Sequence, residues 1–251
     1  MGSSQLRDAY RRLNDRIEAA AIRSGRLPND VLTVAVTKNA SPDQIRQLVE
    51  LGHVDLGENR VQQLAHRVTQ LDEFLSRRRT LGRATSKNAV ELPEQVRWHM
   101  VGHLQRNKVK QVLPFVQLIH SVDSLRLAEE LHGHADRMEC VADVLIQINT
   151  AQEAGKHGVA APAVLHLAEQ IDTMVHLRLR GLMTMAPLNE NPENSRACFA
   201  LSADIFRDIR QAGFVGQYFN VLSMGMTNDF EVAIEEGANV LRIGRALFGE
   251  E

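Results

Sequence analysis

Lys38 is the residue with the clearest chemical potential in the sequence. It directly follows an apolar, β-branched run over residues 31–37. Side chains alternate along a strand, so Val34, Val36 and Lys38 share one face, and if the valines fill a barrel, Lys38 points into its mouth. An amine that is partly desolvated there has a lowered pKa and can form a Schiff base near neutral pH. Position alone still favours a solvated lysine at a strand end.

Two glycine turns near the C-terminus are typical of phosphate-binding loops. They are Ser223-Met224-Gly225-Met226-Thr227 and Arg242-Ile243-Gly244-Arg245. Glycine lets backbone N–H groups approach an anion, the hydroxyls of Ser223 and Thr227 add donors, and a helix that starts near residue 228 directs its positive end toward the same place. Taken separately, each turn is more often a plain connection. Together with Lys38, they favour a phosphate site.

Asn59 and Glu58 follow the second apolar run and offer polar groups to a ligand. Asn59 could hydrogen-bond a bound molecule, Glu58 could order a neighbouring base, and either could instead cap the next helix. His99 and His103 are four residues apart but flank an expected strand end, so we expect no metal site. The sequence leaves open whether Lys156 forms a second binding or transfer site.

Eight repeats of a strand followed by a helix would position these side chains. We expect strands at residues 31–37, 54–56, 96–101, 116–120, 144–148, 177–183, 219–222 and 240–243, with an additional N-terminal helix over residues 5–24. Such alternation predicts one α/β domain over residues 1–251, a single (β/α)8 TIM barrel with its site at the carboxyl ends of the strands. The periodicity leaves an open doubly wound sheet possible. Residues 81–93, polar and irregular, are expected to form a flexible insertion.

Composition and charge exclude several classes of function. The net charge of -2 provides no basic face for nucleic acid. No run approaches the ~20 apolar residues of a membrane span, and the N-terminus lacks the apolar core of a signal peptide. We therefore expect a cytoplasmic protein with no membrane or nucleic-acid partner, and we expect it to be a monomer.

At these residues the sequence resembles the YggS/PROSC family of pyridoxal phosphate homeostasis proteins, whose fold is like the barrel of alanine racemase. The resemblance rests on blocks that span most of the chain: Val34-Ala35-Val36-Thr37-Lys38, Leu56-Gly57-Glu58-Asn59-Arg60, Trp98-His99-Met100-Val101-Gly102-His103, Gly181-Leu182-Met183-Thr184 and the two glycine turns. It implies that Lys38 holds pyridoxal 5'-phosphate (PLP) as an internal aldimine. It also implies that Ser223, Met224, Gly244 and Arg245 surround the phosphate, and that Arg242 lies near the ring nitrogen or the phosphate. The family usually has threonine or serine where Arg245 stands.

The resemblance implies a non-catalytic protein that stores PLP or delivers it to PLP-dependent apoenzymes. The alternative is a PLP-dependent amino-acid racemase or decarboxylase, and an aldolase-like barrel would also use a strand-end lysine beside a phosphate site. Tyr10 and Tyr218 are the two tyrosines, and neither ends an expected strand. A two-base racemase needs an acid on each face of its ligand, so the sequence favours the carrier.

Overall fold

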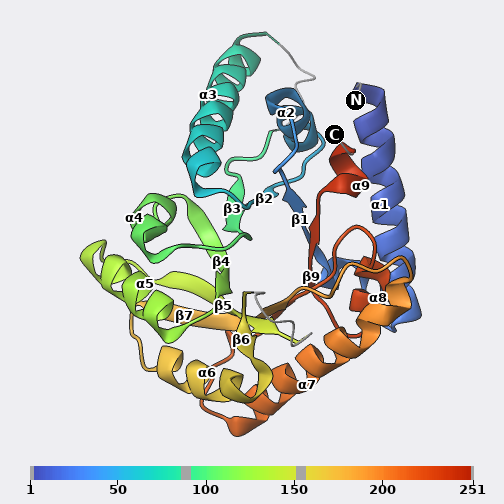
Figure 1. Ribbon diagram of the computed structural model, residues 1–251. Helices are drawn as coiled ribbons and strands as arrows, with labels where there is room; N and C mark the ends of the chain where they lie inside the picture. The colour runs from blue at the N-terminus through green and yellow to red at the C-terminus, as the bar shows by residue number, and fades with distance from the viewer. Residues whose placement is uncertain (1–2, 86–91, 151–156, 250–251) are drawn as a thin grey trace.

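A closed ring of parallel strands forms the centre of the computed structural model, which describes residues 3–85, 92–150 and 157–249 (Figure 1). Within these residues, each of eight strands pairs with the next, β4 pairs with β5, and β9 pairs with β1 to close the ring. The strands are β1 (Leu32–Val36), β2 (Asp55–Glu58), β3 (Arg97–Met100), β4 (Val116–Val122), β5 (Ala142–Asn149), β7 (Leu177–Thr184), β8 (Val221–Ser223) and β9 (Val240–Ile243). The two-residue β6 (Val159–Ala160) pairs with the end of β5, outside the ring.

Helices surround the ring and bury its outer face (Figure 1). They are α1 (Ser3–Arg23), α2 (Pro42–Glu50), α3 (Val61–Thr85), α4 (Val109–Val112), α5 (Leu125–Arg137), α6 (Val164–Asp172), α7 (Arg196–Ala212), α8 (Phe230–Glu235) and α9 (Arg245–Phe248). The additional helix α1 packs against α8, α9 and α2, and its residues Leu6, Leu13 and Ile17 are buried. Within the described residues, no helix is long and apolar enough to cross a membrane.

Local sequence fixes the start of α2, the helix that follows the turn carrying Lys38. Ser41 Oγ accepts from Gln44 N at 3.2 Å, and Ser41 N donates to Gln44 Oε1 at 2.8 Å. This capping box, with Pro42 in the first helical position, satisfies backbone donors that a helix start otherwise leaves unpaired. The capping box therefore fixes the C-terminal end of the turn between β1 and α2.

Inward-facing side chains divide the barrel interior into an apolar part and a polar part. The apolar part is a cluster that includes Val34, Leu118, Leu145, Met183 and Val240. The polar part is a chain of hydrogen-bonded side chains that begins at the amino end of β2 and β3 and ends at β9: Arg97, Asp55, His99, His120, Ser223 and Arg242. We call it the interior polar chain.

The barrel predicted from the sequence is confirmed, and each of the eight expected runs overlaps a strand of the ring. The expected insertion over residues 81–93 differs in its first part, because α3 continues to Thr85 and makes residues 81–85 helical. Residues 86–91 of that segment, and Lys156, lie outside the described residues.

Candidate functional site

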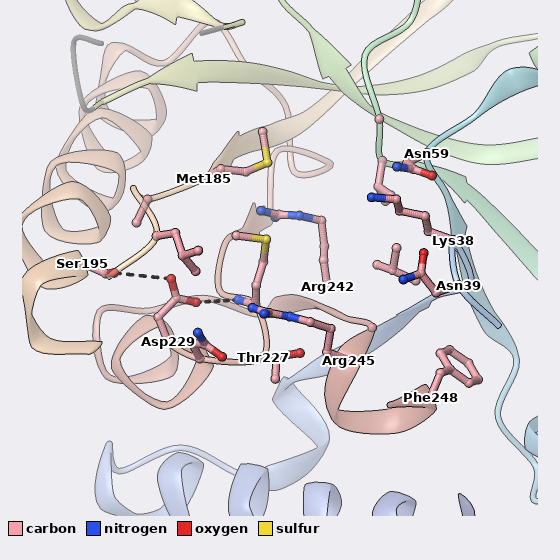
Figure 2. A pocket seen from close by; sticks show the side chains of 18 of the residues that line it. Lys38, Asn39, Asn59, Met185, Ser195, Thr227, Asp229, Arg242, Arg245 and Phe248 are labelled. Atoms are coloured by element: carbon pink, nitrogen blue, oxygen red, sulfur yellow. Dashed lines mark hydrogen bonds between the residues drawn. The ribbon is translucent and has the colours of Figure 1, made fainter. Parts of the chain in front are cut away.

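A cavity of about 470 Å³ opens at the carboxyl ends of the strands (Figure 2). The residues singled out in the sequence that line it include Lys38, Asn59, Arg242, Gly244 and Arg245. Figure 2 shows Lys38 and Asn59 on one wall, with Met185, Ser195 and Asp229 on the opposite side and the two arginines between them. The structure therefore brings together residues that are up to about 200 positions apart in the sequence.

Lys38 lies on the turn after β1, and its side chain is exposed at the cavity. Val34 and Val36 do face the barrel interior, as expected. The expected partial desolvation of Lys38 is wrong, because β1 ends at Val36 and Lys38 lies on the turn that follows, where its side chain is exposed. Among the described residues, the Lys38 ammonium has neither a hydrogen bond nor an ion pair, so it is available to a ligand.

Arg67 of α3 holds the turn that carries Lys38. Its guanidinium donates to the carbonyl oxygen of Thr37, to that of Lys38 at 3.4 Å and to that of Ala40 at 3.3 Å. Arg67 Nε lies 3.2 Å from Glu58 Oε2. Burial lowers the pKa of Arg67, and the charge of Glu58 opposes that shift. No spacing in the sequence links Arg67 to Lys38, and sequence reasoning missed it.

Glu58 is fully buried and completes this support. Its carboxylate accepts from Thr37 Oγ1 at 3.0 Å, from Asn59 N at 2.9 Å and from Arg60 N at 3.3 Å. A carboxylate with this many donors is an anchor for the backbone. Glu58 was expected to order a neighbouring base or to cap the next helix; its contacts are instead with Thr37, with the backbone before α3 and with Arg67, so it orders the Lys38 turn.

Asn59 lines the cavity, and its side-chain oxygen is buried. Among the described residues, Asn59 Oδ1 has no hydrogen-bond partner. Gly102 allows this close arrangement, since a Cβ there would lie 2.2 Å from the Asn59 carbonyl oxygen. Buried polar atoms in folded proteins are nearly always paired, so the unpaired oxygen makes Asn59 a residue to test in ligand binding.

Arg242 places a fixed positive charge in the floor of the cavity. Its NH1 donates to Ser223 Oγ at 2.7 Å and its NH2 donates to the Thr184 carbonyl oxygen at 2.8 Å. Burial lowers the pKa of Arg242 to about 10, with the charge of Asp229 opposing the shift. The guanidinium therefore stays protonated at neutral pH, and both hydrogen bonds fix its direction.

Ser223 lies behind Arg242 and does not line the cavity. Its hydroxyl is also hydrogen-bonded to His120 Nδ1 at 2.9 Å, and His120 Nε2 lies 3.0 Å from His99 Nδ1. Burial, together with the charges of His99 and Arg242, lowers the pKa of His120 well below its usual value. A neutral His120 allows the Arg242 cation to remain beside it without charge repulsion.

The two glycine turns expected to bind phosphate are joined to each other. Arg242 N donates to the Gly225 carbonyl oxygen at 3.1 Å, and Ala246 N donates to Thr227 Oγ1 at 3.2 Å. Thr227, Gly244 and Arg245 line the cavity at this junction. The Met224 side chain is instead buried in the outer core, and its backbone N–H donates to the Val240 carbonyl oxygen, away from the cavity.

Asp229 is a cavity residue that sequence reasoning missed. Burial raises the pKa of Asp229, while the hydrogen bond from Met226 N at 2.7 Å and the charge of Arg242 oppose the rise. Ser195 Oγ donates to its other oxygen at 3.4 Å. Its place directly before α8, where aspartate is a favoured helix cap, was the available signal.

The arrangement suits a small anionic molecule that carries an aldehyde or ketone. Lys38 provides a nucleophilic amine, Arg242 a fixed cation and Asn59 a polar amide, all on one cavity. A primary amine and a carbonyl carbon form a Schiff base, which anchors such a ligand covalently.

Comparison with known proteins gives concordant matches. A family model described as "Alanine racemase, N-terminal domain" matches residues 59–251. The chain is 35% identical over 243 residues to a pyridoxal phosphate homeostasis protein of Aquifex aeolicus, covering 95% of each chain. Among solved structures, it is similar to an unknown protein from Bifidobacterium adolescentis, with a TM-score of 0.85 and 34% identity over 98% of this chain and 95% of that one. It is also similar to PipY of Synechococcus elongatus with PLP bound, with a TM-score of 0.75 and 30% identity over 94% of this chain and 99% of that one.

Proposed function

The chain belongs to the family of pyridoxal phosphate homeostasis proteins, and from this premise we propose that it binds PLP on Lys38 for storage or delivery. The observation that carries the proposal is the Lys38 amine, which is unpartnered among the described residues and faces the same cavity as the buried cation of Arg242 and the Asn59 side chain. When bound, the cofactor supplies the aldehyde with which Lys38 forms its Schiff base. The related PipY has been solved with PLP bound, which supports the same ligand here.

The roles of the other residues follow from where they face the cavity. Thr227, Gly244 and Arg245 would hold the phosphate at the junction of the two glycine turns, and Ser223 would act indirectly by directing Arg242. Arg242 would face the ring nitrogen. Because Arg242 stays protonated and offers only donors, it would leave that nitrogen unprotonated, which weakens electron withdrawal by the ring and suits a carrier better than a catalyst.

Borohydride trapping tests the anchor directly. PLP is added to the purified protein, the visible absorption of the Schiff base is recorded, and the linkage is reduced and mapped by peptide mass spectrometry. We expect modification of Lys38, and loss of the visible band in Lys38→Ala. Lys108→Ala is the matched control, since Lys108 lies in a turn that does not line the cavity, and it should behave like the wild type. Trapping on another lysine, or an unchanged band in Lys38→Ala, contradicts the proposal.

We also propose that the protein is a monomer, that it acts in the cytoplasm and that it delivers PLP to PLP-dependent apoenzymes. The cavity is open at the barrel mouth, where a recipient can approach the Lys38 side. Light scattering measures the mass of the loaded protein and so its oligomeric state. Delivery is measured by the activation of an apoenzyme with the loaded protein, compared with activation by the same concentration of free PLP. Activation no faster than the spontaneous release of PLP would reduce the role to storage.

A further inference from the structure

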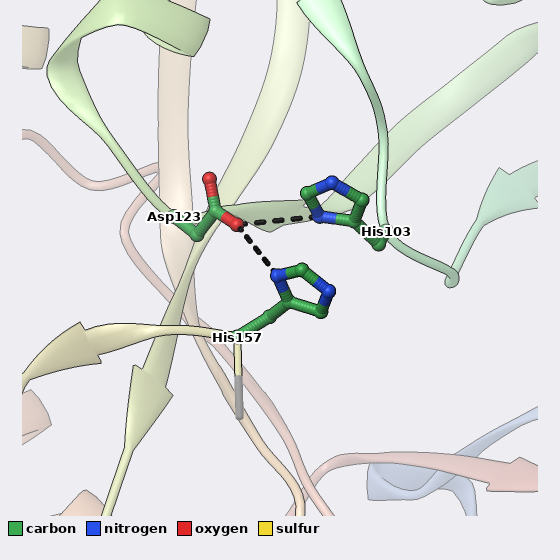
Figure 3. A group of neighbouring side chains, drawn as sticks. All are labelled: His103, Asp123 and His157. Atoms are coloured by element: carbon green, nitrogen blue, oxygen red, sulfur yellow. Dashed lines mark ion pairs between the residues drawn. The ribbon is translucent and has the colours of Figure 1, made fainter. Parts of the chain in front are cut away.

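Three side chains from separate loops meet on the rim of the barrel, beside the cavity (Figure 3). His103 follows β3, Asp123 follows β4 and His157 precedes β6. The Nδ1 atoms of His103 and His157 lie 3.3 Å and 3.7 Å from the same oxygen, Asp123 Oδ2. One ligand-type atom of each residue lies within 4.8 Å of those of the other two. We call these residues the rim triad.

The charge of Asp123 calls for a cation at this place. Its side chain is only 15% exposed, and in the described part of the chain its ion pairs are with these two histidines and with no arginine or lysine. An imidazole carries charge only when it is protonated, so these two contacts do not give the shielded carboxylate a permanent counter-charge. A bound divalent ion would supply that charge.

The two nitrogen–oxygen separations of the rim triad match those of a tetrahedral metal site. Zinc binds imidazole nitrogen and carboxylate oxygen at about 2.0–2.2 Å, so neighbouring ligand atoms in a tetrahedron lie roughly 3.4 Å apart. The two nitrogen–oxygen distances of the rim triad, 3.3 Å and 3.7 Å, are close to this separation. Two nitrogens and one oxygen form the donor set that catalytic zinc sites use, with a fourth position left to water or substrate.

Ion binding requires one histidine ring to turn. The two rings are stacked, with centroids 3.8 Å apart and planes inclined by 12°, whereas a metal lies in the plane of each imidazole that binds it. The His157 side chain is 56% exposed and has room to turn. Its backbone is held, since buried Gln147 in the barrel interior donates to the His157 carbonyl oxygen at 3.2 Å.

We propose that the rim triad binds one divalent transition-metal ion of the zinc type, with an open coordination position at the barrel mouth. His103 and His157 also line the cavity, so the open position adjoins the space where Lys38 lies. No metal site was expected from the sequence, because the neighbouring histidine considered with His103 was His99. The His99 side chain belongs to the interior polar chain and does not reach the rim triad. The third partner, Asp123, becomes visible only when β3 and β4 are placed side by side.

Calorimetric titration of zinc chloride into the chelator-treated protein tests the proposal. We expect one equivalent to bind to the wild type. His103→Asn, Asp123→Asn and His157→Asn should each weaken binding by about tenfold or more, because even loss of an outer-shell partner costs ~10–100-fold in affinity. His176→Asn is the matched control: it removes another histidine–aspartate pair, in which His176 Nε2 lies 3.1 Å from Asp136 Oδ1, and it should leave binding unchanged.

Cobalt substitution supplies a second readout. Bound cobalt should give the strong visible bands of a tetrahedral site in the wild type and in His176→Asn. These bands should be lost in His157→Asn. Since the His157 side chain is exposed, its replacement does not disturb the fold, and misfolding does not explain such a loss. Absence of saturable zinc binding by the wild type overturns the proposal. The proposal is also overturned if all three rim-triad variants bind zinc as tightly as the wild type, or if His176→Asn weakens zinc binding as much as they do. Either result means adventitious binding to surface histidines.

Discussion

Arg67 acts on Lys38 through the peptide backbone. It donates to carbonyl oxygens of the turn from residue 37 to residue 40, and Glu58 holds it from the other side. The Lys38 amine itself remains without a partner among the described residues, so support of the backbone leaves the reactive end of the side chain free. Precise placement of a binding group generally depends on such supporting contacts.

Replacement of Arg67 by glutamine should destabilise the protein and weaken cofactor binding together. Removing one partner of a buried ion pair costs about 3–5 kcal/mol because the other charge is left uncompensated. Since the Thr37 hydroxyl and two backbone N–H groups still serve Glu58, we expect about 3 kcal/mol, at the lower end of that range. Urea denaturation measures the free energy of unfolding, and absorbance titration with PLP measures binding.

Arg46→Gln is the control for this prediction, because the Arg46–Asp43 pair on α2 is exposed and is expected to contribute less than about 1 kcal/mol. The double variant Glu58→Gln with Arg67→Gln should recover part of the loss, since no buried charge is then left alone. An Arg67→Gln protein as stable as Arg46→Gln would show that the pair does not support the turn.

Residues adjoining an apolar run could be predicted, and residues that act from another element could not. Lys38 and Asn59 follow strands and Arg242 lies in the last strand, one residue before its end, and parallel strands bring such positions to one rim. Arg67 and the rim triad depend on contacts between different elements, which no local spacing encodes. The Met224 side chain faces outward because alternation places it on the opposite face from Ser223.

At the scale of elements, the Gly225 turn joins β8 to α8 within very little space. Gly225 has a φ of +90°, and a Cβ at this position would lie 2.6 Å from the Ala233 Cβ and 3.0 Å from the Phe230 Cα. The glycine is therefore required twice, for its backbone conformation and for the close approach of the turn to α8. The same turn presents Thr227 to the cavity.

Gly225→Ala should therefore destabilise the protein more than Gly213→Ala. Gly213, at the end of α7, also has a positive φ of +77°, but a Cβ there has no neighbour nearer than 3.9 Å. We expect about 1–2 kcal/mol for the backbone conformation alone at Gly213, and a further 1–3 kcal/mol, roughly, for overpacking at Gly225. Thermal denaturation compares the two variants, and equal losses would refute the steric part of the argument.

The strands and helices themselves were predictable because local pattern and global fold agree. The Ser41 capping box starts α2 where the sequence indicates, and the apolar runs coincide with the strands. α3 extends to Thr85, although the segment over residues 81–93 was expected to be irregular. Tertiary context commonly overrides weak local preference in this way.

At the scale of the whole molecule, the interior polar chain links the two ends of the barrel. It begins at Arg97, nearly half exposed at the amino end of β3, and ends at Arg242 in the cavity floor. Burial opposes ionisation of Asp55, but hydrogen bonds from Arg97 and His99 outweigh it and lower the pKa of Asp55 to about 2. The folded state therefore favours the ionised form of the Asp55 carboxyl group.

Acid should weaken the fold through Asp55. A carboxyl group whose pKa is lower in the folded than in the unfolded chain contributes stability above the unfolded pKa, near 4, and that contribution is lost as the pH falls toward 2. The full contribution is about 2 kcal/mol, and roughly 1 kcal/mol of it disappears between about pH 5 and pH 3. Urea denaturation at both pH values should show a smaller decrease for Asp55→Asn than for the wild type.

Asp43→Asn controls for the general effect of acid, because Asp43 is 80% exposed and pairs only at the surface. Its free energy of unfolding should decrease between the two pH values as much as that of the wild type. If Asp55→Asn decreased equally, Asp55 would have no special part in acid sensitivity.

Closure of the strand ring also limits how other macromolecules can bind. Every strand of the ring has a neighbour on both sides, so within the described residues only the two-residue β6 leaves a strand edge unpaired. Partners that add an extended segment to an open sheet edge, and the edge-to-edge association that leads to aggregates, both need such an edge. A protein that receives cofactor from this barrel must therefore recognise the side chains of its helices and rim loops, rather than extend its sheet.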